Sequence, residues 1–102
     1  MTIRWSARAR SDIRELQKYI AKDSPYYARQ FIGKIFGAVE KLIDHPKIGR
    51  QVSEAERDDV RELIFQGYRI IYAIKRDSVY IVTVVHGSRD LTRTDINPWN
   101  VL

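Results

Sequence analysis

The sequence contains no cysteine, only two histidines, and few residues that interrupt helices and strands: five glycines and three prolines in 102 residues. Without cysteine there is no disulfide scaffold, thiolate zinc site or cysteine nucleophile. The two histidines, His45 and His86, do not lie at ligand spacing from carboxylates, and no Gly-rich phosphate-binding motif occurs. We therefore expect neither a metal nor a cofactor.

Long apolar runs are also missing. The longest, Val79 to Val85, is interrupted by Tyr80 and Thr83. Neither a signal peptide nor a membrane span is indicated, so we expect a cytoplasmic protein without a membrane partner. The length suits a single domain over residues 1–102.

Positive charge is in excess and unevenly placed. Eighteen Lys and Arg oppose 13 Asp and Glu, for a net charge of +5. Residues 1–50 carry +6, whereas residues 51–62 carry −3. Arginine is twice as frequent as lysine, and its planar fork favours pairing with carboxylate or phosphate. The composition indicates an acidic protein or RNA as partner, or a basic surface that serves solubility alone.

The first half of the chain has helical periodicity. A short strand is predicted at Thr2–Trp5, followed by an amphipathic helix from Ala7 to Lys22 with Ser6 as its N-cap. Ser24 and Pro25 begin a second helix that runs to about Asp44. The connection is short, so the two helices should form an antiparallel hairpin.

The second half has strand patterns. A loop is predicted from Pro46 to Asp59, then strands at Val60–Phe65, Tyr68–Lys75 and Ser78–His86, and a polar tail from Gly87 to Leu102. Two-residue gaps between the strands predict an antiparallel meander. The order is β-α-α-β-β-β, an α+β domain with a helical hairpin packed on a small antiparallel sheet.

The predicted sheet is apolar on both faces, since Ile70, Tyr72 and Ile74 alternate with Ile71 and Ala73. Two helices can cover only one face. The second face should be covered either by the tail, through Trp99, Val101 and Leu102, or by another chain.

Charged side chains cluster on or just past the last strands, at Arg61, Arg69, His86 and Arg89. The first two lie among apolar neighbours, so they either pair with Asp90 or Glu62 or border a site. A catalytic triad of His86, Ser88 and Asp90 is excluded because close neighbours at a strand end rarely adopt that geometry.

Two glycines, Gly33 and Gly37, lie four residues apart on the outer side of the second predicted helix. Each costs about 1 kcal/mol relative to alanine in a helix interior. Either an exposed helix face tolerates them, or they form a smooth patch where a partner's backbone approaches.

Motifs along nearly the whole chain resemble ParE-type toxins of bacterial toxin–antitoxin modules, within the wider ParE/RelE superfamily. The matching segments are Trp5-Ser6, Asp12-Ile13, Tyr19-Ile20, Pro25, Gly49-Arg50, Val60-Arg61-Glu62-Leu63, Gly67-Tyr68-Arg69-Ile70-Ile71-Tyr72 and His86-Gly87-Ser88-Arg89-Asp90. The resemblance implies the β-α-α-β-β-β fold and a plasmid-stabilisation or growth-control toxin. It also implies a ParD-like antitoxin encoded beside the toxin, with a heterotetramer or larger complex as the expected assembly. The basic helical hairpin and the sheet that is apolar on both faces indicate that this antitoxin is acidic and folds on binding.

The resemblance leaves three functions open. ParE-type proteins poison DNA gyrase by binding it, without catalysis, and His-Gly-x-Arg-Asp at His86 follows the ParE pattern. RelE-like members cleave ribosome-bound messenger RNA; for that activity the candidate residues are Arg69, His86 and Arg89. However, no tyrosine follows Tyr80, and no basic residue lies in the stretch just before Gly67. We favour gyrase binding, with the ribonuclease and an inactive toxin-like binding module as alternatives.

Two sets of binding residues are expected for such a toxin, from their positions and residue types. The expected gyrase-binding residues are Arg61, Arg69, His86, Arg89, Arg93 and Trp99. The expected antitoxin-binding residues are Gly33, Phe36, Gly37 and Tyr80.

Overall fold

The computed structural model describes residues 1–88 and residue 99. Its elements, in chain order, are β1 (Thr2–Trp5), α1 (Ala7–Ala21), α2 (Pro25–Glu40), the short 3₁₀ helix η1 (Lys41–Ile43), β2 (Arg50–Gln51), β3 (Val60–Phe65), β4 (Tyr68–Ile74) and β5 (Ser78–His86). The α+β class and the predicted order of helices and long strands are confirmed. The predicted loop contains one additional short strand, β2.

The five strands form one sheet in the order β1-β5-β4-β3-β2. Neighbouring strands are antiparallel except for β1 and β5, which run parallel. The expectation of a purely antiparallel sheet is therefore corrected to a mixed sheet. A parallel pair needs a long connection, and here the chain between β1 and β5 holds the helical hairpin and the other strands.

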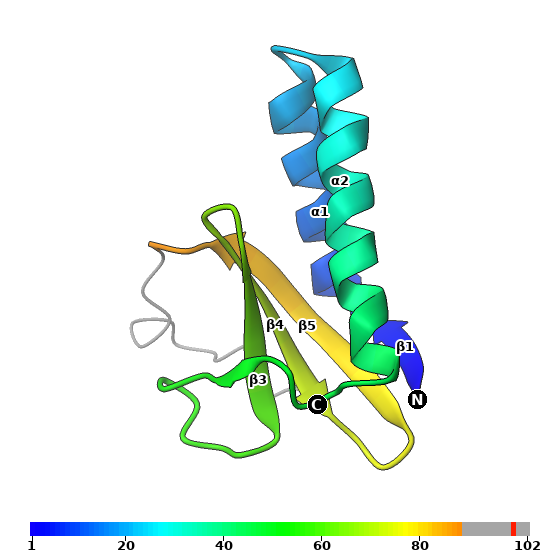
Figure 1. Ribbon diagram of the computed structural model, residues 1–102. Coiled ribbons are helices and arrows are strands. Elements are labelled where there is room, and N and C mark those ends of the chain that lie inside the picture. The colour runs from blue at the N-terminus through cyan, green and yellow to red at the C-terminus, as the bar shows by residue number, and fades with distance from the viewer. Residues whose placement is uncertain (89–98, 100–102) are drawn as a thin grey trace.

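Both helices begin at the predicted caps. The Ser6 hydroxyl accepts a hydrogen bond from the Ala9 amide at 2.9 Å, and the Ser24 hydroxyl accepts one from the Tyr27 amide at 3.1 Å. Pro25 occupies the first turn of α2, where its missing N–H costs no helical bond. The hairpin lies against one face of the sheet, and its far end, with the α1–α2 turn, projects past the ends of the strands (Figure 1).

The main core lies between the hairpin and the sheet. The helices contribute one apolar side each, and β4 and β5 contribute the facing side chains: Ala9, Ile13, Leu16, Phe31, Ile32, Ile35, Val39, Leu42, Ile70, Tyr72, Val79, Ile81 and Val84. This cluster accounts for the amphipathic periodicity of both helices.

A second apolar cluster covers the opposite face of the sheet. It contains Val52, Val60, Ile71, Ala73, Val82, Val85 and Trp99. Trp99 is only 2% exposed, and its carbonyl accepts a hydrogen bond from Arg57 at 3.3 Å. The sequence left open whether the tail or another chain covers this face, and the structure shows that the tail does so through Trp99. Val101 and Leu102 lie outside the described residues.

The start of α1 is tied to an irregularity in β5. The pairing of β4 with β5 shifts between Ile71 and Tyr72, which leaves Val82 as an extra residue. The Ser6 hydroxyl donates to the Val82 carbonyl at 2.7 Å, and the Asp12 carboxylate accepts from the Val84 amide at 3.0 Å. Two side chains of this region thus bond backbone groups beside the bulge.

Candidate functional site

Arg69 lies at the centre of a buried ion-pair cluster on the sheet face opposite the hairpin. Its guanidinium donates to the Glu62 carboxylate at 2.7 and 2.9 Å and to the Glu54 carboxylate at 2.9 Å twice. Arg69 is 6% exposed and Glu62 is 3% exposed. The hydrogen bonds that Arg69 donates to Glu54 and Glu62 raise the pKa of Arg69, and those that Glu54 accepts from Arg69 lower the pKa of Glu54. The expected pairing of Arg69 with Glu62 is confirmed.

A cleft of about 490 Å³ opens beside this cluster. We call it the Arg69 cleft; it is lined by Arg50, Gln51, Ser53, Glu54, Glu62, Ile64, Gly67, Arg69 and Gly87. Arg50 is mostly exposed, and its guanidinium lies 3.7 Å from Glu62. Two carboxylates therefore balance the two arginines, so the cleft offers little net attraction to a phosphate.

Arg61 does not belong to this cleft. Successive side chains of a strand point to opposite faces, so Arg61 lies on the hairpin face, as Tyr72 opposite it does. Its guanidinium donates to the Gly49 carbonyl at 3.0 Å and to Asp58 at 3.5 Å, and its Nε is a buried donor without a partner in the described residues. Arg61 and Arg69 are thus held apart by the sheet.

Gly49 packs so closely against Tyr72 that no larger residue fits at this position. The Gly49 amide donates to the Tyr72 hydroxyl at 2.9 Å, and the Tyr72 hydroxyl donates to the Pro46 carbonyl at 2.7 Å. A Cβ at residue 49 would lie 2.5 Å from the Tyr72 oxygen. Burial raises the pKa of Tyr72, which keeps the hydroxyl protonated as a donor.

His86 is exposed at the end of β5. Its Nδ1 lies 2.8 Å from the Ser88 hydroxyl, and its ring packs against Tyr68 with 5.4 Å between ring centres. Of the other residues expected to bind gyrase, Trp99 is buried in the second core, and Arg89 and Arg93 lie outside the described residues. The structure thus does not gather the described members of this set into one exposed surface.

Of the four residues expected to bind an antitoxin, three lie together on α2 and Tyr80 lies apart. Gly33, Phe36 and Gly37 are three and four residues apart in the helix, so they share one side of it. Phe36 packs against Trp5 with 5.1 Å between ring centres. Gly33 and Gly37 lie on the outer side of α2, and apart from the local helix backbone and the adjoining residues no heavy atom lies within 4 Å of a Cβ placed at either position. Tyr80 packs against the second core, on the far side of the sheet.

Two features were missed from the sequence. Glu54 lies in the acidic part of the predicted loop, where nothing in the sequence marks it as the partner of Arg69 that it is in the structure. A second cleft, the β1 cleft, has a volume of about 540 Å³ and is lined by Ile3, Arg4, Trp5, Arg10, Ile13, Arg14 and Phe36. One signal was available, since Arg10 and Arg14 are one helical turn apart beside the aromatic Trp5.

Neither a metal nor a membrane site is seen in the part of the chain that the structure describes. Among residues 1–88 and 99, no three His, Cys, Asp or Glu side chains gather so that they could hold a metal ion. No helix in the same residues is long and apolar enough to cross a bilayer.

Comparison with known proteins identifies relatives along most of the chain. The toxin candidate Y4kP of Sinorhizobium fredii is 38% identical over 82% of this chain and 85% of its own length. Toxin RelE3 of Caulobacter vibrioides is 29% identical over 78% of this chain and 86% of its own.

Two solved structures share the fold. A chain of the chromosomal ParDE system of P. aeruginosa has a TM-score of 0.71 at 19% identity, covering 84% of this chain and 95% of that one. A chain of the RelBE2 toxin–antitoxin complex of Mycobacterium tuberculosis has a TM-score of 0.55 at 23% identity, covering 83% and 88%. The family model described as ParE toxin of type II toxin-antitoxin system, parDE, matches residues 3–91. The chain therefore belongs to the ParE family of type II toxin–antitoxin toxins.

Proposed function

We propose that this toxin inhibits growth in the cytoplasm by binding DNA gyrase, without catalysing a reaction, and that an acidic antitoxin encoded beside it neutralises it. The family match and the structural likeness to a ParDE chain support the toxin–antitoxin part. The excess of positive charge favours an acidic partner.

The choice of binding over catalysis rests on the state of Arg69. Cleavage of RNA requires a base for the 2′-hydroxyl, an acid for the leaving oxygen, and cations that stabilise the phosphate. Arg69 is 6% exposed and binds Glu62 and Glu54 through four hydrogen bonds. A phosphate would have to displace a carboxylate from Arg69, so the attraction between the guanidinium and the phosphate would be largely offset by the ion pair that is lost.

The ribonuclease is the second candidate because of His86. This histidine is exposed and next to Gly87, which lines the Arg69 cleft. The His86 ring packs against Tyr68 on the hairpin face, whereas Arg69 lies on the opposite face of the sheet, so a nuclease site that used both would require the end of β5 to rearrange.

Two assays on the same preparations distinguish these functions. Purified toxin should inhibit gyrase supercoiling of relaxed plasmid, whereas primer extension on translated transcripts should show no new cuts. His86→Ala should weaken gyrase inhibition, because His86 is among the residues expected to bind gyrase, and should leave the transcripts uncut. His45→Ala is the matched control, since it removes the other exposed histidine.

The opposite outcome would identify a nuclease. Promptly appearing, codon-phased cuts that His86→Ala reduces by about 10²-fold or more, and His45→Ala leaves unchanged, would overturn the gyrase proposal. No supercoiling inhibition and no cuts at micromolar toxin would instead favour an inactive binding module.

A further inference from the structure

A groove lies between α2 and β3, toward the opposite end of the sheet from β1. We call it the α2–β3 groove; its volume is about 560 Å³. Helix α2 and its C-cap contribute Lys34, Gly37, Ala38 and Lys41 to the lining, the loop before β2 contributes Ile48, and β3 contributes Ile64. The groove is therefore on the side of the molecule away from the β1 cleft.

Two exposed isoleucines form the apolar part of the groove. Ile48 is 57% exposed and Ile64 is 53% exposed. Within the described residues the pairing of β2 with β3 extends only to Glu62, so no strand covers β3 at Ile64. Large apolar side chains grouped in an open groove are typical of a contact surface.

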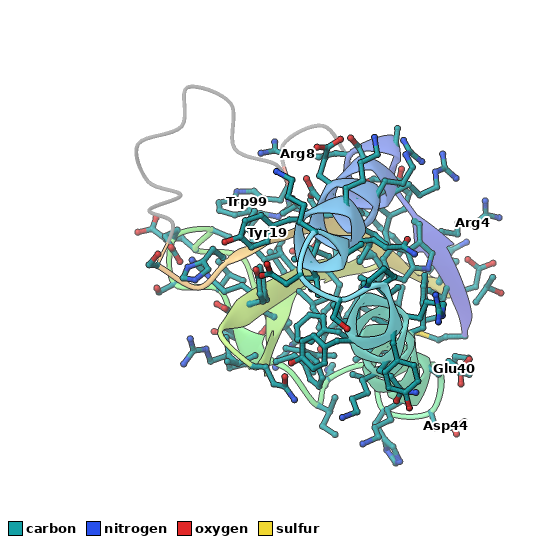
Figure 2. The ribbon with its side chains drawn as sticks, turned by 90° about the horizontal axis from the view of Figure 1, so that it is seen from above. Arg4, Arg8, Tyr19, Glu40, Asp44 and Trp99 are labelled. Atoms are coloured by element: carbon teal, nitrogen blue, oxygen red, sulfur yellow. The ribbon has the colours of Figure 1, made fainter. Side chains whose placement is uncertain are left out.

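The charge of the groove has one sign. Lys34 and Lys41 are exposed, and the ion pairs seen in the described residues involve other side chains. Among those residues, no Asp or Glu lines the groove. Figure 2 shows Glu40 and Asp44, the acidic residues that flank Lys41 in the sequence, on the same side of the molecule as Arg4 of β1. The groove therefore attracts an acidic partner.

The middle of the α2 wall carries very little side chain. Gly37 and Ala38 lie between the two lysines, and apart from the local helix backbone and the adjoining residues no heavy atom lies within 4 Å of a Cβ placed at Gly37. The distance at which two helices pack depends on the side chains at their contact. A helix can therefore approach α2 closely at this point, with a lysine on either side of the contact.

We propose that the α2–β3 groove binds an acidic, amphipathic helix on the surface of the toxin's target. The proposal rests on the gyrase part of the proposed function and names the surface through which the toxin acts. Carboxylates of the helix pair with Lys34 and Lys41, and its apolar side chains pack on Ile48 and Ile64.

The spacing of the lysines defines the helix. Lys34 and Lys41 are seven residues apart, about 10.5 Å along the axis of α2. A second helix that lies along α2 repeats one side at the same spacing, so acidic residues at positions i and i+7 match both lysines. Apolar residues at i+3 and i+4 then face the isoleucines. One face of an extended chain repeats at about 6.6–6.8 Å, which does not match.

DNA is the competing occupant, because the two lysines would also attract phosphates. Ile48 and Ile64 decide against it. Exposed apolar side chains gain free energy when they are buried against protein, whereas contacts to phosphate and sugar come from charged and polar groups.

The first test reverses the charge of the groove in the full-length toxin. Lys34→Glu with Lys41→Glu should raise the toxin concentration that half-inhibits gyrase supercoiling at least about tenfold, because the new carboxylates repel the acidic helix. The matched control is Lys18→Glu with Lys22→Glu, the same change on exposed lysines of the hairpin that do not line the groove. It should inhibit within about twofold of wild type. Both double variants should bind the protein encoded beside the gene with similar Kd values.

The second test fills the middle of the groove without changing its charge. Gly37→Leu should weaken gyrase inhibition at least about tenfold, and unfolding is not the cause because leucine favours a helix more than glycine does. Gly33→Leu is the matched control, since Gly33 is an equally open position of α2 that does not line the groove. It should inhibit like wild type.

Other outcomes would overturn the proposal. Wild-type inhibition by Lys34→Glu with Lys41→Glu, or an equal loss in the Lys18 and Lys22 control, would show that the target binds elsewhere, although the gyrase proposal would survive. Loss of binding to the neighbouring protein in the groove variant alone would assign the groove to the antitoxin. A mobility shift of plasmid DNA by wild-type toxin alone, lost in the groove variant, would identify DNA as the occupant. No inhibition of supercoiling by wild-type toxin would remove the gyrase proposal and this one together.

Discussion

Removing the charge of Glu62 should destabilise the fold far more than removing that of Glu54, although both bind the same guanidinium. The Glu62 side chain is 3% exposed and that of Glu54 is 16% exposed. Breaking a buried ion pair by neutralising one partner costs about 3–5 kcal/mol when the other charge is left unpaired. Arg69 keeps one carboxylate in either variant, so each cost falls below that range.

We expect Glu62→Gln to lower the free energy of unfolding by about 2–3 kcal/mol, and Glu54→Gln by about 1 kcal/mol, because water reaches the second carboxylate. For a domain of this size, 1 kcal/mol shifts the Tm by about 4–8 °C. The Tm should therefore fall by about 10–20 °C in the first variant and by about 4–8 °C in the second. Urea denaturation at pH 7 gives the free energies directly.

Arg50→Gln is the control, since this arginine also faces Glu62 but is 69% exposed and 3.7 Å away. An exposed pair contributes about 0–1 kcal/mol, so its Tm should move by only a few degrees. Equal losses for Glu54→Gln and Glu62→Gln, or a loss for Arg50→Gln as large as that for Glu62→Gln, would refute the argument that burial sets the cost.

Three further predictions concern the two glycines of α2, stability at low pH, and Trp99 in the tail. Gly33→Ala and Gly37→Ala should each stabilise α2 by about 0.5–1 kcal/mol in urea denaturation, since both Cβ positions are open; weaker antitoxin binding in either variant would show that a partner approaches there. Folding lowers the pKa of Glu54 from its ordinary value of 4.5, so the ionised carboxylate contributes its full stabilisation above pH 4.5 and loses it as the pH falls through the lower pKa of the folded state. Glu54→Gln should therefore flatten the acid side of the curve of unfolding free energy against pH. Trp99→Ala should lower the free energy of unfolding by about 3–5 kcal/mol, measured by thermal and urea unfolding, because the ring is buried in the second core. An unchanged Tm with lost gyrase inhibition would show instead that Trp99 contacts the target.

The helices and long strands could be predicted because local signals define them. Ser6 and Ser24 cap the helices as expected, and the two-residue turn at Gln66 and Gly67 has positive φ at both positions. Such a turn joins adjacent antiparallel strands and sets their pairing. These are features of neighbouring residues, which a single sequence displays.

Features that depend on distant residues could not be predicted. The parallel pairing of β1 with β5 joins the two ends of the domain, and β2 is two residues long, so neither has a local signature. Glu54 looks like one charge of a solvated acidic run until the loop folds over Arg69. The burial of Arg69 among apolar neighbours did predict a carboxylate partner, and Glu62 is one; Asp90, the alternative, lies outside the described residues.

The bulge in β5 connects these local and distant features. Ser6 caps α1 and also bonds the Val82 carbonyl, while Asp12 bonds the Val84 amide, so the first turns of α1 are tied to β5. β1 pairs with the same strand, so the helix and the free sheet edge share one support. Arg10 lies between these two anchoring residues and lines the β1 cleft. The contacts of Ser6 and Asp12 with β5 therefore fix the backbone that carries Arg10 relative to the sheet.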